Sequence, residues 1–165
     1  MTLDAIGLID TRAILATAAQ LKDAGNQHFK NRQSALAIRA YHEAIVHCLV
    51  LHNAMQPASS EELDKRTLDP GAQSISTKTT REAIALMVAC YSNLAACHVG
   101  AQAWERVIQC TSKALLLDKS HAKCLNRRGI AHQALGDNLL AKCDFEAAVA
   151  LNPKGIYNRE WAMHS

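Results

Sequence analysis

The stretch NRRGIAHQALGDNLLAKCDFEAAVALNP, residues 126–153, has a counterpart 34 residues earlier, SNLAACHVGAQAWERVIQCTSKALLLDK at residues 92–119. Between the two stretches Gly129 falls on Ala95, and Ala148 falls on Ala114. A further copy lies upstream in LKDAGNQHFKNRQSALAIRAYHEAIVHC, residues 21–48. A fixed period of this length indicates a repeat architecture, in which each unit buries its apolar face against the next.

Each copy has the pattern of two helices joined by a short turn. In the third copy Gly136-Asp137 separates a helix near 120–134 from another near 138–151, and Asn152-Pro153 ends the second helix. Small residues recur at slots where two helices must approach closely, and bulky residues fill the spaces between them. The small residues are Gly25, Ala95, Gly129, Ala44, Ala114 and Ala148, and the bulky ones are Leu21, Tyr41, Leu94, Leu125 and Phe145. The pattern predicts an all-α solenoid of three repeats.

A long insertion separates the first two copies, because Gly25 and Ala95 are 70 residues apart, 36 more than the period of 34. The residues LVLHNAM, 49–55, can lengthen the second helix of the first copy. The polar stretch QPASSEELDKRTLDPGAQSIST, 56–77, has the composition of a loop with at most one short helical turn. Thr79 followed by Glu82 fits a capping box that begins the next helix.

We therefore expect a single domain over residues 1–165. Repeat one covers about 18–51, the insertion about 52–80, repeat two about 88–121 and repeat three about 122–153. The tail 154–165 is short for the capping helix that usually closes a solenoid, so either the cap is reduced or the chain continues beyond it.

The composition excludes several classes of function. Apolar residues make up 49% of the chain and aromatic residues 4%, which suits closely packed helices. The net charge of +3 has no Lys/Arg block behind it, so nucleic-acid binding is not predicted. No apolar run approaches the length needed to span a bilayer, and the N-terminus lacks the basic region typical of a signal peptide. We expect a cytosolic monomer with no membrane partner.

Six cysteines are present, and none forms a CxxC pair. Cys97 and Cys143 lie in helical patterns, where a free thiol is expected to be a buried or partly buried apolar filler. Cys48 and His52 can share a helix face, but two ligands alone make a poor zinc site. The sequence also lacks the common hydrolase, P-loop and metalloprotease motifs. We expect no metal, no cofactor and no enzymatic activity.

The period and its small residues resemble the tetratricopeptide repeat over about residues 18–48 and 88–153. The third copy is the most typical, whereas the second has Ala95 in place of the family glycine and the first lacks the terminal proline. The segments AGNQHFK, AYHEAI and YSNLAACHVGAQAWERVIQCTSKAL, together with the insertion, look most like the tetratricopeptide repeat domain nine family. They are also similar to the tetratricopeptide portion of the large immunophilins.

One subset of this superfamily binds the extreme C-terminus of the seventy- and ninety-kilodalton heat-shock chaperones, which ends in Glu-Glu-Val-Asp. The resemblance implies a carboxylate clamp, with Lys-x-x-x-Asn in the first repeat, Asn in the second and Lys-x-x-x-Arg in the third. Residues of the expected types occupy every slot of this pattern. They are Lys22, Asn26, Asn93, Lys123 and Arg127.

Physical chemistry gives the same set a role as a binding site for an anion. Lys22 and Asn26 are four residues apart and share one face of a helix, as do Lys123 and Arg127. All belong to the first helix of their repeat, which should line the inner face of the stack. Cations and amides that meet in one groove offer many donors, and they suit the carboxylate at the end of a peptide.

Secondary contacts to a peptide are possible from Lys30 and Arg128, which could reach acidic residues, and from Phe29, which could face an apolar side chain. Core packing explains Phe29 nearly as well. The favoured interpretation is a co-chaperone-like adaptor for heat-shock chaperone tails. The alternative is a scaffold that binds another protein through its convex face or through the insertion.

Overall fold

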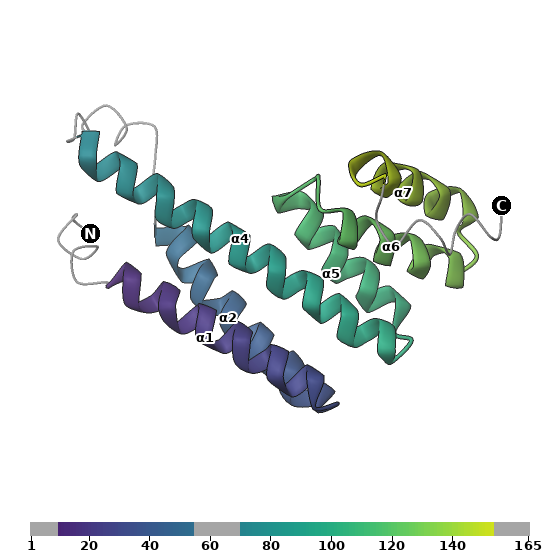
Figure 1. The fold of residues 1–165 in the computed structure, drawn as a ribbon, viewed down its shortest axis with the longest axis horizontal. Helices are drawn as coiled ribbons and strands as arrows, with labels where there is room; N and C mark the ends of the chain where they lie inside the picture. The colour runs from purple at the N-terminus through teal and green to yellow at the C-terminus, as the bar shows by residue number, and fades with distance from the viewer. Residues whose placement is uncertain (1–9, 55–69, 154–165) are drawn as a thin grey trace.

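The computed structural model describes residues 10–54 and 70–153, and within these ranges every regular element is an α-helix (Figure 1). The helices form three antiparallel pairs in chain order. They are α1 (Thr11–Lys30) with α2 (Ser34–Ala54), α4 (Pro70–Gly100) with α5 (Trp104–Leu117), and α6 (Ala122–Ala134) with α7 (Asn138–Leu151). The third pair lies where the sequence places its two helices, and the arrangement is the expected all-α solenoid.

The same turn joins the two helices of every pair. Arg32, Gln102 and Gly136 occupy one repeat slot, and all three have positive φ, at 59°, 52° and 87°. Glycine adopts this left-handed conformation without steric cost, whereas Arg32 and Gln102 adopt it at some cost. The turn is therefore fixed by the helix packing on either side of it, and a glycine is present only in the third repeat.

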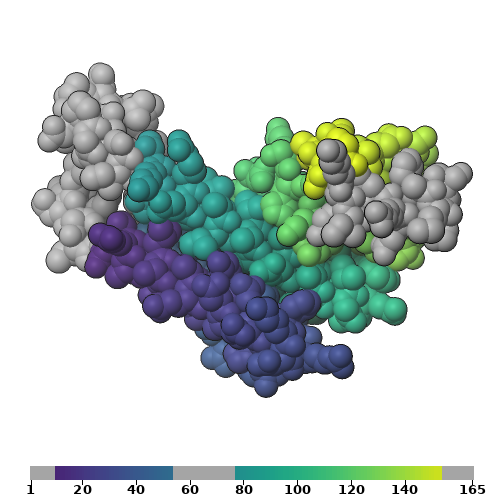
Figure 2. Space-filling view, viewed as in Figure 1, coloured from purple at the N-terminus to yellow at the C-terminus, as the bar shows by residue number. Residues whose placement is uncertain are grey.

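The first helix of each pair lies on the inner side of the stack. α4 contacts both α1 and α6, whereas the described parts of α2, α5 and α7 make no comparable contacts with one another. Figure 2 shows α4 in the middle of the molecule, with α1 on one side and the third pair on the other. α1, α4 and α6 therefore line a common concave face, as the sequence predicts.

The ends of the insertion differ from expectation. α2 continues to Ala54, which confirms the lengthened helix, but α4 begins at Pro70 and not near Thr79. The capping box at Thr79 is wrong, because that residue lies inside α4. Proline is well tolerated in the first turn of a helix, so it begins this one without breaking it. The remaining loop prediction, residues 55–69, lies outside the described residues.

The end of α2 and the added turns of α1 extend the core, because Leu51 is buried and Ile14 and Leu15 pack against the same cluster. Ala83 and Met87 of α4 are buried in one cluster with Cys48 and Leu51 of α2 and with Ala18 of α1. α1 also begins at Thr11, earlier than the expected start near 18, and Asp10 caps it by accepting a hydrogen bond from the Ala13 amide at 3.0 Å. Burial of these apolar side chains, which local sequence signals do not reveal, explains the longer α1 and α2.

Two helices are long and apolar enough to cross a membrane by length and composition, so the expectation of no such run is wrong. They span Ser34–Asn53 and Thr77–Gly100. Each has an apolar side packed inside the solenoid, with Tyr41 of α2 and Met87 and Leu94 of α4 almost completely buried. We interpret both as core helices of the repeat stack.

The cysteines are free thiols, as expected, but they differ in exposure. Cys97 is buried as predicted, whereas Cys143 is exposed on α7, so its assignment as a buried filler is wrong. Burial raises the pKa of Cys48 to about 11 and that of Cys90 to about 12. Both thiols therefore remain protonated at neutral pH and pack as small apolar groups.

We predict that Gly25→Ala and Gly129→Ala each lower the free energy of unfolding by about 1–2 kcal/mol. A Cβ at Gly25 would lie 2.6 Å from Cε1 of Tyr41, and one at Gly129 would lie 2.7 Å from Cε1 of Phe145. Gly100→Ala is the control, because a Cβ there meets nothing within 4 Å. Urea unfolding followed by circular dichroism measures all three. Equal midpoints for Gly25→Ala and wild type would show that the Tyr41 ring yields freely.

Candidate functional site

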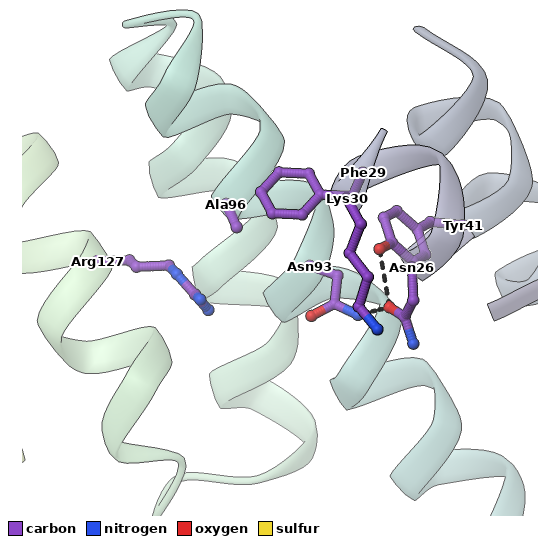
Figure 3. A pocket seen from close by; sticks show the side chains of 7 residues that line it. All are labelled: Asn26, Phe29, Lys30, Tyr41, Asn93, Ala96 and Arg127. Atoms are coloured by element: carbon purple, nitrogen blue, oxygen red, sulfur yellow. Dashed lines mark hydrogen bonds between the residues drawn. The ribbon is translucent and has the colours of Figure 1, made fainter. Parts of the chain in front are cut away.

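A pocket of about 220 Å³ opens on the concave face, where α1, α4 and α6 meet (Figure 3). Three of the clamp residues predicted from the sequence line it, and each comes from a different repeat. They are Asn26, Asn93 and Arg127. Its lining residues are Asn26, Phe29, Lys30, Tyr41, Asn93, Ala96 and Arg127. The repeat register therefore brings together side chains that are up to 101 positions apart in the chain, counted from Asn26 to Arg127.

A shared hydrogen-bond acceptor joins the two asparagines. Asn93 Nδ2 donates to Asn26 Oδ1 at 2.9 Å, and the Tyr41 hydroxyl donates to the same oxygen at 2.9 Å. The carbonyl oxygen of Asn26 has two lone pairs, and both are used. In Figure 3 the carbonyl oxygen of Asn93 faces away from Asn26, toward the side of Arg127. The asparagines thus form a bonded pair, not two independent side chains.

Arg127 reaches the pocket from α6 and is held there by α4. Its Nη1 donates to Ser92 Oγ at 2.6 Å and to the Ser92 carbonyl oxygen at 3.0 Å. Ser92 is only 4% exposed, so the anchor is inside the stack. The guanidinium has further N–H groups beyond those two bonds, and its planar fork can bind a carboxylate through two parallel hydrogen bonds.

The two clamp lysines lie outside the pocket that the other three clamp residues line. Among the described residues, neither Lys22 nor Lys123 lines the pocket itself. The Lys22 ammonium lies 3.1 Å from the carboxylate of its neighbour Asp23. Lys123 is exposed in the first turn of α6, one helical turn before Arg127. Each lysine lies one helical turn before a lining residue, Asn26 or Arg127, but the structure does not bring its side chain into the pocket.

Of the three residues predicted as secondary peptide contacts, two line the pocket and one does not. Phe29, 43% exposed, and Lys30 both line the pocket. Arg128 does not, because it faces α7, where Nε and Nη2 donate to the two carboxylate oxygens of Asp144 at 2.8 and 2.6 Å. A guanidinium held by a buried carboxylate is not available to a peptide. Arg128 is therefore a structural residue, and the structure contradicts its prediction as a peptide contact.

The pocket is electropositive and has few acceptors. Lys30 and Arg127 line it, and Lys123 lies near the N-terminus of α6, where the helix dipole already favours negative charge. His121 caps that helix by accepting a hydrogen bond from the Cys124 amide at 3.3 Å. Burial lowers the pKa of His121, with Asp118 opposing this shift and Arg127 adding to it, so the ring stays a neutral acceptor. The arrangement suits binding of an anion.

Sequence reasoning missed three residues of the site. Tyr41 was assigned to the core, and its ring is buried as expected, but its hydroxyl belongs to the asparagine pair. Ser92 and Ala96, on either side of Asn93 in α4, anchor Arg127 and leave room for the pocket. A signal for Tyr41 was present, because the same slot in repeat three holds Phe145, which has the ring without the hydroxyl.

Comparison of the sequence with known proteins finds relatives for part of the chain. Over 80 residues, 48% of the chain, it is 42% identical to the human peptidyl-prolyl cis-trans isomerase FKBP4. The mouse FKBP4 is 41% identical over the same length. The match spans only 17% of the human protein's length. No family model matches the chain.

Solved structures resemble almost the whole chain. The C-terminal TPR-containing domain of a Plasmodium falciparum FK506-binding protein has a TM-score of 0.68 at 24% identity, covering 94% of this chain and 89% of that one. The Arabidopsis OM64 TPR domain has a TM-score of 0.65 at 22% identity, covering 92% and 95%. The second TPR of Spaghetti (RPAP3), bound to the HSP90 peptide SRMEEVD, has a TM-score of 0.63 at 24% identity, covering 91% and 99%.

The fold is that of a tetratricopeptide repeat domain. More particularly, the sequence match supports the resemblance to the tetratricopeptide portion of the large immunophilins. The resemblance to the tetratricopeptide repeat domain nine family stays a prediction.

Proposed function

We propose that this chain is a non-enzymatic binding module that holds the C-terminal carboxylate of a peptide in its concave groove. The observation that carries the proposal is the pocket in which Asn26 and Asn93 meet Arg127, each from a different repeat. Such a site offers a guanidinium and amide donors to a carboxylate, and capture of a C-terminal carboxylate is a known mode of peptide recognition.

The partner we propose is the tail of a heat-shock chaperone of the seventy- or ninety-kilodalton class, which ends in Glu-Glu-Val-Asp, bound in the cytosol. Two negative charges come together at such an end, the α-carboxylate and the aspartate side chain. Arg127, with Lys123 and Lys22 one helical turn before the lining residues, can neutralise both, and Phe29 offers an apolar wall to the valine. The HSP90 peptide seen in the structurally similar RPAP3 domain supports this choice of partner.

Isothermal titration with three synthetic peptides tests the proposal. A peptide ending in Met-Glu-Glu-Val-Asp with a free C-terminus should bind with a Kd on the order of micromolar, and more weakly as salt rises. The same peptide with a C-terminal amide should not bind measurably. A third peptide with one glycine added after the aspartate keeps the net charge but moves the carboxylate, and it should also fail. Equal affinity for the first peptide and the amide would contradict the proposal.

A scaffold that binds through its outer face is the second candidate. One observation favours it, since Val46, Leu49 and Val50 on α2 are 58%, 38% and 48% exposed and follow helical spacing. A protein partner that docks there would not depend on the end of a chain. Absence of binding for the free-acid peptide would leave this surface as the better candidate.

A further inference from the structure

We propose that the buried hydroxyl of Tyr41 is a positioning group that fixes which atoms of Asn26 and Asn93 face a bound peptide. The proposal rests on the function proposed above, because it describes how the same pocket is made selective for a carboxylate. Tyr41 does not touch the peptide itself. It acts through Asn26, whose oxygen accepts its hydrogen bond at 2.9 Å.

The first step is the direction of the Tyr41 hydrogen bond. Tyr41 is 1% exposed, and a buried hydroxyl needs an acceptor for its proton. Burial raises the pKa of Tyr41 to about 12, so the hydroxyl keeps its proton over the whole neutral range. It donates this proton to Asn26 Oδ1. The oxygen of Asn26, and not its nitrogen, must therefore point toward Tyr41.

The orientation of Asn93 follows from that of Asn26. Since Asn26 turns its oxygen inward, Asn93 must present its nitrogen to it, and Asn93 Nδ2 does so at 2.9 Å. The outward groups are then Asn26 Nδ2, a donor, and Asn93 Oδ1, an acceptor (Figure 3). Asn26 Nδ2 uses one N–H in a hydrogen bond to Asp23 Oδ1 at 3.4 Å and keeps the other for a ligand. A free chain end needs donors for its carboxylate and an acceptor for its last peptide N–H. One outward donor and one outward acceptor match these needs.

The repeats themselves show that packing does not require the hydroxyl. Tyr41 lies against Gly25 and Phe145 lies against Gly129, in slots 104 residues apart, and a Cβ on either glycine would meet the ring at 2.6 or 2.7 Å. The two rings fill the same space. In the third repeat Ile130 takes the slot of Asn26, so a hydroxyl would have no amide to orient. The phenol occurs in the repeat that carries the asparagine.

The variant Tyr41→Phe tests this role because it keeps the ring and removes only the hydroxyl. We expect it to weaken binding of the free-acid peptide about tenfold, the usual scale for loss of one hydrogen bond at such a site. In an Asn26→Ala background the same change should have no further effect, because the group through which Tyr41 acts is gone. A merely structural role would lower affinity by the same factor in both backgrounds.

Tyr91→Phe is the matched control, since Tyr91 lies on α4 outside the pocket lining, with Lys113 Nζ 5.8 Å from its ring centre. It should bind the peptide as wild type does. The side-chain amide signals of Asn26 and Asn93 in a nitrogen-15 NMR spectrum should move in Tyr41→Phe and stay in place in Tyr91→Phe.

The outcomes separate this inference from the proposed function. If wild type does not bind the free-acid peptide, the proposed function fails and this inference fails with it. If wild type binds and Tyr41→Phe binds equally well, or loses the same factor with and without Asn26, the positioning role is wrong while the proposed function stands. A loss confined to the background that has Asn26, with wild-type binding by Tyr91→Phe, supports both.

Discussion

Arg127→Ala is expected to reduce the affinity for a free-acid chaperone-tail peptide at least about 30-fold, because truncation of a buried partner of a charge pair costs about 2–5 kcal/mol. Among the described residues that line the pocket, Arg127 supplies the one guanidinium, and Ser92 holds it in place. The remaining lining groups include an ammonium and amides, which cannot replace a two-point contact with a carboxylate. Titration calorimetry at low and at physiological salt measures the loss.

A second substitution separates the charge of Arg127 from its shape. Arg127→Lys keeps the positive charge but removes the planar fork, so we expect an intermediate loss of about tenfold. Arg127→Ala also leaves Ser92 Oγ, which is buried, without this donor, at a cost of about 1 kcal/mol of stability. Unfolding curves should therefore accompany the titrations. We expect both variants to remain folded.

Arg39→Ala is the matched control for net charge. Arg39 lies on α2, where it pairs with Glu43 at 2.9 Å and its side chain is 78% exposed. The substitution changes the total charge by the same amount but should leave the peptide affinity almost unchanged. An equal loss for Arg39→Ala and Arg127→Ala would show that long-range attraction, and not the pocket, holds the peptide.

The parts of this protein that follow from sequence are those that the repeat period fixes. A period of 34 residues predicts which helices share a face, so it brings Asn26, Asn93 and Arg127 to one pocket without knowledge of any contact. The close approach at Gly25 and Gly129 follows from the same alignment. The register does not predict which way a long side chain turns. The pairing of Lys22 with Asp23 and of Arg128 with Asp144 on α7 therefore could not be predicted from it.

The insertion shows a different limit. Local signals gave a loop through Thr77 and a helix start at Thr79, yet α4 begins at Pro70. Serine and threonine are poor helix formers only by a few tenths of a kcal/mol each, so a helix that continues from the apolar part of α4 tolerates them. Further along α4, Met87 and Ala83 are buried in one cluster with Leu51 of α2. This contact joins residues on opposite sides of the insertion, so no window of sequence contains it.

A comparison of equivalent slots would have assigned Arg128 correctly. Its slot holds Ala24 in the first repeat and Leu94 in the second, and the slot of Asp144 holds Ala40 and Cys110. Two charged residues of opposite sign thus replace small or apolar residues in the same repeat. Since a buried charge requires a partner, these two substitutions predict a salt bridge between Arg128 and Asp144. The salt bridge is present, with 2.6 Å between Arg128 Nη2 and Asp144 Oδ1, and Asp144 is 6% exposed.

Asp144→Ala should therefore be among the most destabilising single changes in the chain, lowering the free energy of unfolding by about 2–3 kcal/mol. The carboxylate accepts from Arg128 Nε at 2.8 Å and Nη2 at 2.6 Å, and His132 Nε2 lies 4.0 Å from it. Its removal leaves the guanidinium of Arg128, 26% exposed, without its main partner. This residual exposure lets water reach the charge, so the cost stays below that of a fully buried pair.

A double variant tests whether the cost comes from the unpaired charge. Arg128→Leu with Asp144→Cys gives the third repeat the residues that the second repeat has at these slots, and it should recover most of the lost stability. Glu146→Ala serves as the control, since it breaks the exposed pair with Lys142 at 3.8 Å and should change little. Urea unfolding measures all of these variants. If the double variant is no more stable than Asp144→Ala, the loss of stability comes from a cavity in the packing of α7 and not from an uncompensated charge. Recovery of stability would show that the ion pair takes the place of apolar packing in this one repeat.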